Sequence, residues 1–296
     1  MPALLLLIAV TAVWGVTFVQ VKDALELYPL FAFLSVRFAI AGVVLAVPAR
    51  GRVRSLRREG MLAGVVLGVL LAAAYAFQTA GLERTTVSST GFITGLYVVF
   101  TPLIAFWLFG TRVPGVVLVS VSFAVLGLLL LNGVPGGSTL GNSLVLANAV
   151  IQSFQIASME RFAPRYDARA LTFLQMSTCF VGFAVIAGVA GQFEVPRGWT
   201  VWGALIVTGV FAGALGYLIA TWVQARTTAA RAALVFTLEA PFAALFGVLL
   251  ADEVLGWLGW LGCAVMLAGI VLAEPAAANT LRRLAGRRRS EDAISG

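Results

Sequence analysis

Apolar residues dominate this chain in long stretches, and charged residues, glycine or proline mark the boundaries between them. A helix needs about 20 apolar residues to cross the hydrocarbon core of a bilayer. Ten stretches reach approximately this length, at residues 2–21, 30–49, 60–82, 87–109, 114–132, 140–160, 170–190, 199–222, 229–250 and 256–274. The connections between them are short and leave no room for a soluble catalytic domain. The pattern predicts an all-α polytopic membrane protein with ten transmembrane helices.

The composition agrees with this pattern. Of the 296 residues, 60% are hydrophobic and 11% are charged, against roughly 25% charged in a soluble domain. So few polar residues could not cover a water-soluble globule of this size, which excludes the soluble classes. Histidine is absent, and the two cysteines are Cys179 and Cys263. We therefore expect no metal site, no cofactor and no Ser-His-Asp triad.

Basic residues lie mainly in alternate connections. Sixteen of the 20 lysines and arginines fall on the side of the N-terminus, three fall on the other side, and Arg37 lies inside the second stretch. The positive-inside rule therefore predicts that both termini are cytoplasmic. Topology explains the formal net charge of +7, so we expect no nucleic-acid partner. Arginine outnumbers lysine by 19 to 1, which favours a bacterial origin and a plasma (inner) membrane location.

Two segments are similar to each other. Arg84–Thr86 precedes an apolar stretch interrupted by Pro102, and Arg226–Thr228 precedes one interrupted by Pro241. They open the fourth and the ninth predicted span, and an offset of five spans turns the second copy upside down in the membrane. Inverted repeats of this kind build secondary transporters. We expect two inverted five-helix repeats at residues 1–138 and 139–275, followed by a basic cytoplasmic tail at 276–296.

Short motifs extend this similarity over nearly the whole chain. They are Trp14-Gly15 with Phe18 and Lys22, Arg37-Phe38, Ser89–Phe92 leading to Tyr97 and Pro102, Trp222–Gln224, Arg226–Thr228, Leu238–Pro241 and Asp252-Glu253. In this order the chain resembles EamA-type members of the drug/metabolite transporter superfamily. The resemblance implies transport through a central cavity, with export of amino acids, amines or related metabolites. The second half departs from it, because Ala149–Ile151 replaces the Trp-Gly pair of the first half.

Two strongly ionisable residues lie well within predicted spans. A charged side chain at the centre of a membrane helix costs about 2.5–3.5 kcal/mol, so it normally faces protein or water. Glu239 could bind an amine or cation of the substrate, could carry a proton, or could satisfy backbone donors near Pro241 or pair with Arg37. Arg37 could hold neighbouring helices together or recognise a substrate carboxylate. Without histidine, Glu239 is the candidate for proton coupling.

Uncharged polar and aromatic residues recur at helical spacing in five predicted spans. Residues three, four or seven positions apart share a helix face. Interhelical hydrogen bonds could explain any one set, but five sets on different helices favour a shared wet cavity with aromatic walls. The residues expected to bind substrate are Trp14, Phe18, Arg37, Tyr75, Gln78, Thr94, Tyr97, Gln152, Gln155, Tyr217 and Glu239.

Glycine and proline are placed for close packing or bending. Gly60, Gly64 and Gly68, and also Gly209 and Gly213, recur every four residues, a spacing that lets helix backbones approach closely. The candidate hinges, which could also be static kinks, are Gly91, Pro102 and Pro241.

These features predict a secondary active transporter that works by alternating access around a midplane cavity. Its partners would be a small-molecule substrate and the lipid bilayer, and it could act as a monomer. The chain has no Walker-type loop for direct ATP coupling. Two alternatives are a facilitative channel or a lipid scramblase. An intramembrane enzyme would need two titratable groups within hydrogen-bond reach, and Glu239 with Arg37 is the one obvious pair.

Overall fold

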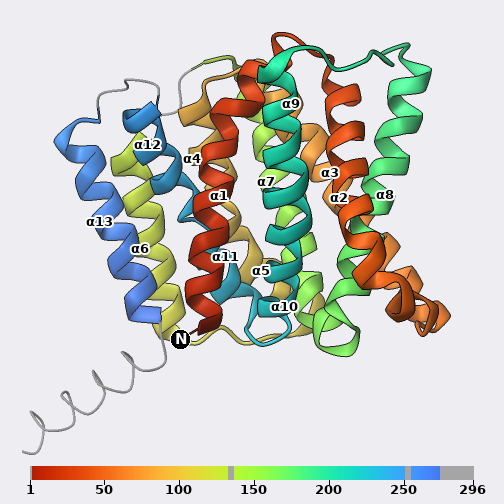
Figure 1. The fold of residues 1–296 in the computed structure, drawn as a ribbon. Coiled ribbons are helices and arrows are strands. Elements are labelled where there is room, and N and C mark those ends of the chain that lie inside the picture. Colours follow the sequence, from red (N-terminus) through yellow and green to blue (C-terminus); the bar gives the residue numbers. More distant parts are fainter. Residues whose placement is uncertain (1, 133–136, 251–254, 274–296) are drawn as a thin grey trace, which may run out of the picture.

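The structure, a computed structural model, describes residues 2–132, 137–250 and 255–273, which form a bundle of helices (Figure 1). This confirms the predicted all-α fold class. The predicted tail at 276–296 and the motif Asp252-Glu253 lie outside the described residues. The elements are α1 (Pro2–Leu25), α2 (Leu30–Arg54), α3 (Arg58–Leu82), α4 (Val87–Gly95), α5 (Tyr97–Phe109), α6 (Gly115–Asn132), α7 (Thr139–Phe162), η1 (Ala163–Arg165), α8 (Ala168–Val189), α9 (Gly198–Ile206), the π-helical η2 (Val207–Gly216), α10 (Tyr217–Gln224), α11 (Ala229–Phe236), α12 (Glu239–Leu250) and α13 (Trp257–Ala273).

The helices follow the predicted spans. Seven stretches of the described residues are long and apolar enough to cross a membrane, and α6 and α13 contain shorter apolar helices. Three of the seven are composite, because each continues through a break or a π-helical segment: α4–α5, α9–η2–α10 and α11–α12. The remaining helix, α7, has 24 residues and so spans about 36 Å. Asn148, Gln152 and Gln155 make it more polar than the others.

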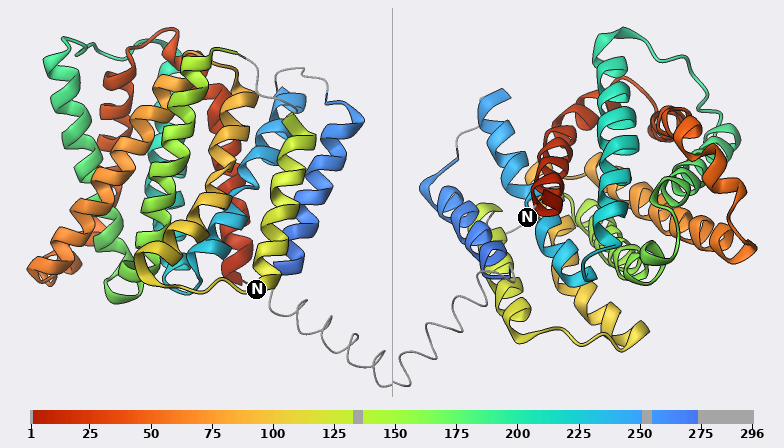
Figure 2. Two further views of the ribbon diagram at one scale, coloured as in Figure 1. Left: turned by 180° about the vertical axis from the view of Figure 1, so that it is seen from behind. Right: turned by 60° about the horizontal axis from the view of Figure 1, so that its bottom comes forward.

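Helices at corresponding positions in the two halves run in opposite directions (Figure 1). α1 leaves the end of the bundle where the N-terminus lies, whereas α7 runs towards that end. The composite helices α4–α5 and α11–α12 are opposed in the same way. α6 and α13 pack together at one edge of the bundle, and α2, α3 and α8 lie at the opposite edge (Figures 1 and 2).

Close contacts between helices depend on glycine. A Cβ atom on Gly64 or Gly68 of α3 would lie 2.6 Å from the side chain of Leu174 or Thr178 on α8. A Cβ atom on Gly209 of η2 would lie 2.9 Å from the carbonyl oxygen of Arg37 on α2. The predicted role of these glycine ladders in helix packing is therefore confirmed.

The composite helices break at positions other than most of the predicted hinges. α4 and α5 are separated at Leu96, whereas Gly91 lies inside α4 and Pro102 lies inside α5. α11 and α12 are separated at residues 237–238, and Pro241 is the third residue of α12. A proline ring clashes with the carbonyl group four residues earlier, which is that of Thr237. Pro241 therefore accounts for the second break, but Pro102 does not coincide with the first.

The capping residues show how the two composite helices correspond. Thr86 caps α4 by accepting a hydrogen bond from the backbone N–H of Ser89 at 3.0 Å. Thr228 caps α11 in the same way, with the N–H of Arg231 at 3.4 Å. Tyr97 and Glu239 each follow the capping threonine by eleven residues, and each is the first residue after its break. The two halves therefore match at the cap and the break, not at the prolines.

Positive charge is concentrated at one end of the bundle. The connections α2–α3, α5–α6, α7–α8 and α10–α11 lie at the same end as the N-terminus (Figure 1). Eleven arginines of the described residues belong to this end, whereas the other end carries three basic residues. The eleven are Arg50, Arg52, Arg54, Arg57, Arg58, Arg112, Arg161, Arg165, Arg169, Arg226 and Arg231.

Candidate functional site

A small cavity lies between the two halves, midway along α1 and α7. Side chains from eight elements line it: α1, α3, α4 and α5 of the first half, and α7, α10, α11 and α12 of the second. The lining residues are Trp14, Tyr75, Gln78, Thr94, Tyr97, Asn148, Gln152, Ile156, Tyr217, Phe236 and Glu239.

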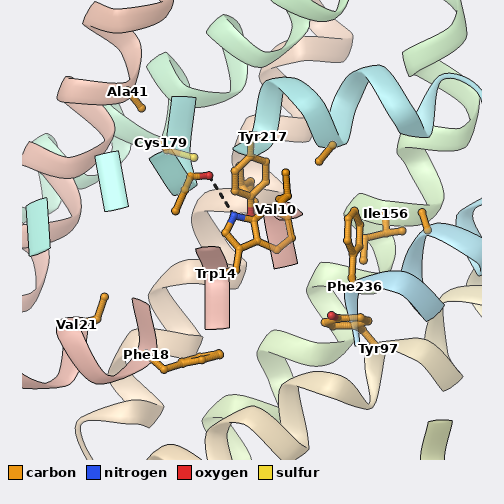
Figure 3. Packing of buried hydrophobic residues seen from close by; sticks show 14 of the residues in the cluster. Val10, Trp14, Phe18, Val21, Ala41, Tyr97, Ile156, Cys179, Tyr217 and Phe236 are labelled. Carbon is orange, nitrogen blue, oxygen red and sulfur yellow. Dashed lines mark hydrogen bonds between the residues drawn. The ribbon is translucent and has the colours of Figure 1, made fainter. Parts of the chain in front are cut away.

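Aromatic rings form one wall of the cavity. The Trp14 ring centre lies 5.2 Å from that of Tyr217 and 5.3 Å from that of Phe236. The Trp14 indole N–H donates a hydrogen bond of 3.1 Å to the carbonyl oxygen of Ala212 in η2, which fixes the ring (Figure 3). The hydroxyl groups of Tyr217 and Tyr75 are joined by a hydrogen bond of 3.0 Å. Rings held in this way could contact a cation or an apolar group of a ligand.

Uncharged polar groups form another part of the wall. The hydroxyl oxygen of Thr94 accepts hydrogen bonds from the side-chain amides of Gln78 at 3.4 Å and Asn148 at 3.3 Å. Gln152 follows Asn148 by four residues and therefore lies one turn along on the same face of α7. This hydrogen-bonded set joins α3, α4 and α7, and it accounts for the polar character of α7.

Glu239 supplies the one carboxylate in this wall. It is the first residue of α12, which α1 approaches very closely at Gly15. A Cβ atom on Gly15 would lie 2.8 Å from the backbone nitrogen of Ala243 and 3.0 Å from the carbonyl oxygen of Glu239. Gly15 therefore lets α1 bring Trp14 beside Glu239. Within the part of the chain that the structure describes, the Glu239 carboxylate makes no hydrogen bond or ion pair.

Arg37 lies behind the cavity wall. Only 4% of the residue is exposed, and its guanidinium carbon lies 4.7 Å from the ring centre of Tyr75 and 5.2 Å from that of Phe38. Its Nε atom has no hydrogen-bond partner among the described residues. Among the described residues, no ion pair joins Arg37 to Glu239. Arg37 therefore places positive charge behind Tyr75 without contacting the cavity.

Eight of the residues predicted to bind substrate line the cavity: Trp14, Tyr75, Gln78, Thr94, Tyr97, Gln152, Tyr217 and Glu239. The structure places the other three elsewhere. Phe18 is buried in the main hydrophobic core, and Arg37 lies behind Tyr75. The Gln155 amide donates a hydrogen bond of 2.9 Å to the side-chain oxygen of Gln175 on α8, and both residues are buried.

The cavity also includes three residues that were not predicted to bind substrate. Asn148 belongs to the same polar face of α7 as Gln152, so helical spacing could have indicated it. Ile156 and Phe236 are apolar, and an apolar residue in a membrane helix carries no sequence signal that separates a cavity wall from a helix contact.

The space between these side chains is about 30 Å³. This volume holds one or two water molecules, whereas sites for small molecules usually measure about 300–1,000 Å³. The cavity in the described conformation is therefore too small to hold a metabolite.

Comparisons with known proteins identify the family. The model of the EamA-like transporter family matches residues 1–133 and 139–273. The chain belongs to the EamA-like transporter family. A relative from Archaeoglobus fulgidus, named an uncharacterized transporter, is 32% identical over 272 residues, which cover 89% of this chain and 82% of the relative. The uncharacterized transporter YcxC of Bacillus subtilis is 24% identical over 289 residues, covering 91% of this chain and 92% of YcxC.

A solved crystal structure also shares this fold. It superposes with a TM-score of 0.74 at 20% sequence identity, and the match covers 94% of this chain and 98% of that protein. The family and the relatives' names identify this protein as a membrane transporter. The transporter has many apolar helices and is therefore a multi-pass membrane protein.

Proposed function

We propose that this transporter is a secondary active carrier that exports small metabolites such as amines or amino acids. The observation that carries the proposal is the Glu239 carboxylate in an otherwise uncharged, partly aromatic cavity. A carboxylate without a protein partner favours a cationic group on the ligand. Trp14 and Tyr97 offer ring faces to the same group, and the amides of Asn148 and Gln152 offer hydrogen bonds to the remainder.

We further propose that residues 1–138 and 139–275 are inverted repeats that enclose this site. Three observations support the repeat: the opposite directions of α1 and α7, the equivalent caps at Thr86 and Thr228, and the matching breaks before Tyr97 and Glu239. Transport sites commonly lie where discontinuous helices of two repeats meet. Here both breaks lie next to residues of the cavity wall.

The proposed transport cycle uses the breaks in the two composite helices. The closed cavity must widen before a metabolite enters, and the segments on either side of Leu96 and residues 237–238 can change their relative angle without breaking a continuous helix. Bending at one break would open the cavity towards one side of the membrane while the other half keeps it shut. The charge of Arg37 makes the electrostatic potential near Tyr75 positive. A bound ligand would therefore place its cationic group near Glu239 and away from Tyr75.

The orientation is part of the proposal. The arginine-rich end of the bundle would face the cytoplasm, and both termini would lie there. The transporter would reside in the plasma (inner) membrane of a bacterium and would need no cofactor.

A ligand screen tests the assignment of substrate class. Purified transporter would be heated with a panel of amines, amino acids and carboxylic acids, and the unfolding midpoint recorded. A ligand that binds only the folded state raises this midpoint. We expect amines or amino acids to raise it, and carboxylic acids without an amino group to leave it unchanged. Stabilisation by those acids alone would contradict the role given to Glu239.

A further inference from the structure

A second hollow lies at the arginine-rich end of the bundle, away from the central cavity. It is a groove of about 700 Å³ that runs beside α10 and is bordered by α1, the end of α2, and the start of α8. Its lining combines arginines with apolar residues of the outer surface. We define it as the α10 groove, and it shares no residue with the central cavity.

The charges of the α10 groove are not balanced. Arg52, Arg169 and Arg226 line it together with one acid, Asp167. One carboxylate oxygen of Asp167 accepts a hydrogen bond of 2.9 Å from the backbone N–H of Arg169 at the start of α8, and the other lies 3.6 Å from Nε of Arg52. Among the described residues, no carboxylate lies within ion-pair distance of the guanidinium groups of Arg169 and Arg226. The groove therefore keeps two uncompensated positive charges.

The apolar part of the groove lies on the outer surface of the bundle. Leu218 and Trp222 lie one turn apart on α10, and Leu6 of α1 lines the same groove. Trp222 is 39% exposed and Leu6 is 42% exposed. The guanidinium carbon of Arg226 lies 4.0 Å from the Trp222 ring centre, and Nη1 donates a hydrogen bond of 2.6 Å to the Trp222 carbonyl oxygen. Tryptophan in this position is typical of the boundary between hydrocarbon and headgroups.

We propose that the α10 groove binds one anionic phospholipid of the cytoplasmic leaflet. The phosphate would lie between Arg169 and Arg226, and an acyl chain would follow Leu218 and Trp222 into the hydrocarbon. The groove offers both parts of such a lipid a matching surface, positive at the membrane boundary and apolar beyond it. Free phosphate would use only the positive part and would leave the apolar surface to other lipids.

Tryptophan quenching by brominated lipids tests this site without any need for transport. The full chain would be placed in neutral detergent micelles with brominated phosphatidylglycerol or brominated phosphatidylcholine at equal mole fractions. We expect phosphatidylglycerol to quench more strongly at low mole fraction, and Trp222→Phe to remove the difference. Equal quenching by the two lipids, or a preference that survives Trp222→Phe, would overturn the proposal.

Two charge variants locate the headgroup. One basic residue near an anionic headgroup changes affinity by about five-fold. Arg169→Gln or Arg226→Gln should each weaken phosphatidylglycerol binding by about that factor, and the double variant by about 25-fold. Arg112→Gln, an exposed arginine at the same end but outside the groove, should leave it unchanged. An unaltered preference in the double variant would contradict the assignment.

Competition with inorganic phosphate distinguishes a lipid headgroup from a free phosphate ion as the ligand of the α10 groove. An excess of inorganic phosphate should not relieve the quenching, because the acyl chains hold the lipid in the groove. Relief by inorganic phosphate would overturn the assignment to a lipid and would identify a site for the free anion.

Discussion

In the proposed mechanism, recognition of the substrate depends most strongly on Glu239. Its carboxylate lines the cavity and has no hydrogen-bond or ion-pair partner among the described residues. A hydrogen bond to a charged group contributes about 1.5–3 kcal/mol, so Glu239→Gln should weaken amine binding by about ten-fold to a hundred-fold. Binding is measured by titration of the purified transporter. Glu83→Gln is the matched control, because Glu83 is exposed and pairs with Arg84 at 3.0 Å. Equal affinities in both variants would remove Glu239 from the site.

Substitution of two glutamines of α7 should affect two different properties, substrate affinity and stability. Gln152 lines the cavity, so Gln152→Ala should weaken substrate affinity by about three-fold to ten-fold, the effect of one neutral hydrogen bond. Gln155→Ala leaves the buried side-chain oxygen of Gln175 without its donor, which costs about 1–3 kcal/mol of stability, while affinity stays unchanged. Titration and thermal unfolding of both variants separate the two effects. An affinity loss in Gln155→Ala with none in Gln152→Ala would reverse the assignment.

These two glutamines also show what the sequence can reveal about single residues. Helical spacing places both near one polar face of α7, and neither spacing nor residue type separates them. Gln175, twenty positions later on α8, accepts a hydrogen bond from the Gln155 amide. This contact separates Gln155 from Gln152, which lines the cavity. Arg37 is a similar case, because its stacking on Tyr75 depends on the packing of α2 against its neighbours. A single sequence does not contain such contacts between distant helices.

At the scale of elements, the contact between α1 and α12 holds the cavity together. Gly15→Ala places a methyl group 2.8 Å from the backbone of α12, so the two helices must separate. Overpacking of this kind costs about 1–3 kcal/mol, and we expect a lower unfolding midpoint. Gly91→Ala is the control, because no described atom outside the neighbouring backbone of its own helix lies within 4 Å of its Cβ position. The same midpoint in both variants would contradict the close contact.

The elements themselves could largely be predicted from the sequence. Long apolar stretches determine where helices lie, because backbone groups in lipid must form hydrogen bonds within the helix. The breaks in the composite helices could be predicted only in part. Proline indicated interruptions in the correct spans. However, α5 continues through Pro102, and the helix is interrupted at Leu96 instead. The capping threonines fix the correspondence better, and the sequence already showed them as the repeated Arg-Thr-Thr.

The orientation of the whole molecule can be tested by labelling from each side. In a variant without Cys179 and Cys263, single cysteines would replace the exposed residues Arg54 and Val195. The end of α2, where Arg54 lies, and the connection from α8 to α9, which contains Val195, are at opposite ends of the bundle (Figure 1). An impermeant thiol reagent added outside intact cells should label Val195→Cys and not Arg54→Cys. The reverse pattern would overturn the predicted cytoplasmic position of the arginine-rich end.

The opposite directions of α1 and α7 could be predicted from the sequence, but the small size of the cavity could not. The odd offset of the repeated motif predicts that the halves are inverted, and α1 and α7 do run in opposite directions. The width of the cavity depends on how closely helices far apart in the sequence pack against each other. The lining side chains leave a space of only about 30 Å³, and no pattern in the sequence indicates this volume.

Counter-flow exchange is the measurement that tests the central claim most directly. Vesicles containing the transporter would be preloaded with an unlabelled amine or amino acid identified by the ligand screen, and uptake of its labelled form would be followed. A carrier that opens its cavity to one side at a time should take up label faster into preloaded vesicles than into empty ones, and Glu239→Gln should abolish the difference. Equal rates with and without preloading, as a channel would give, would contradict the account.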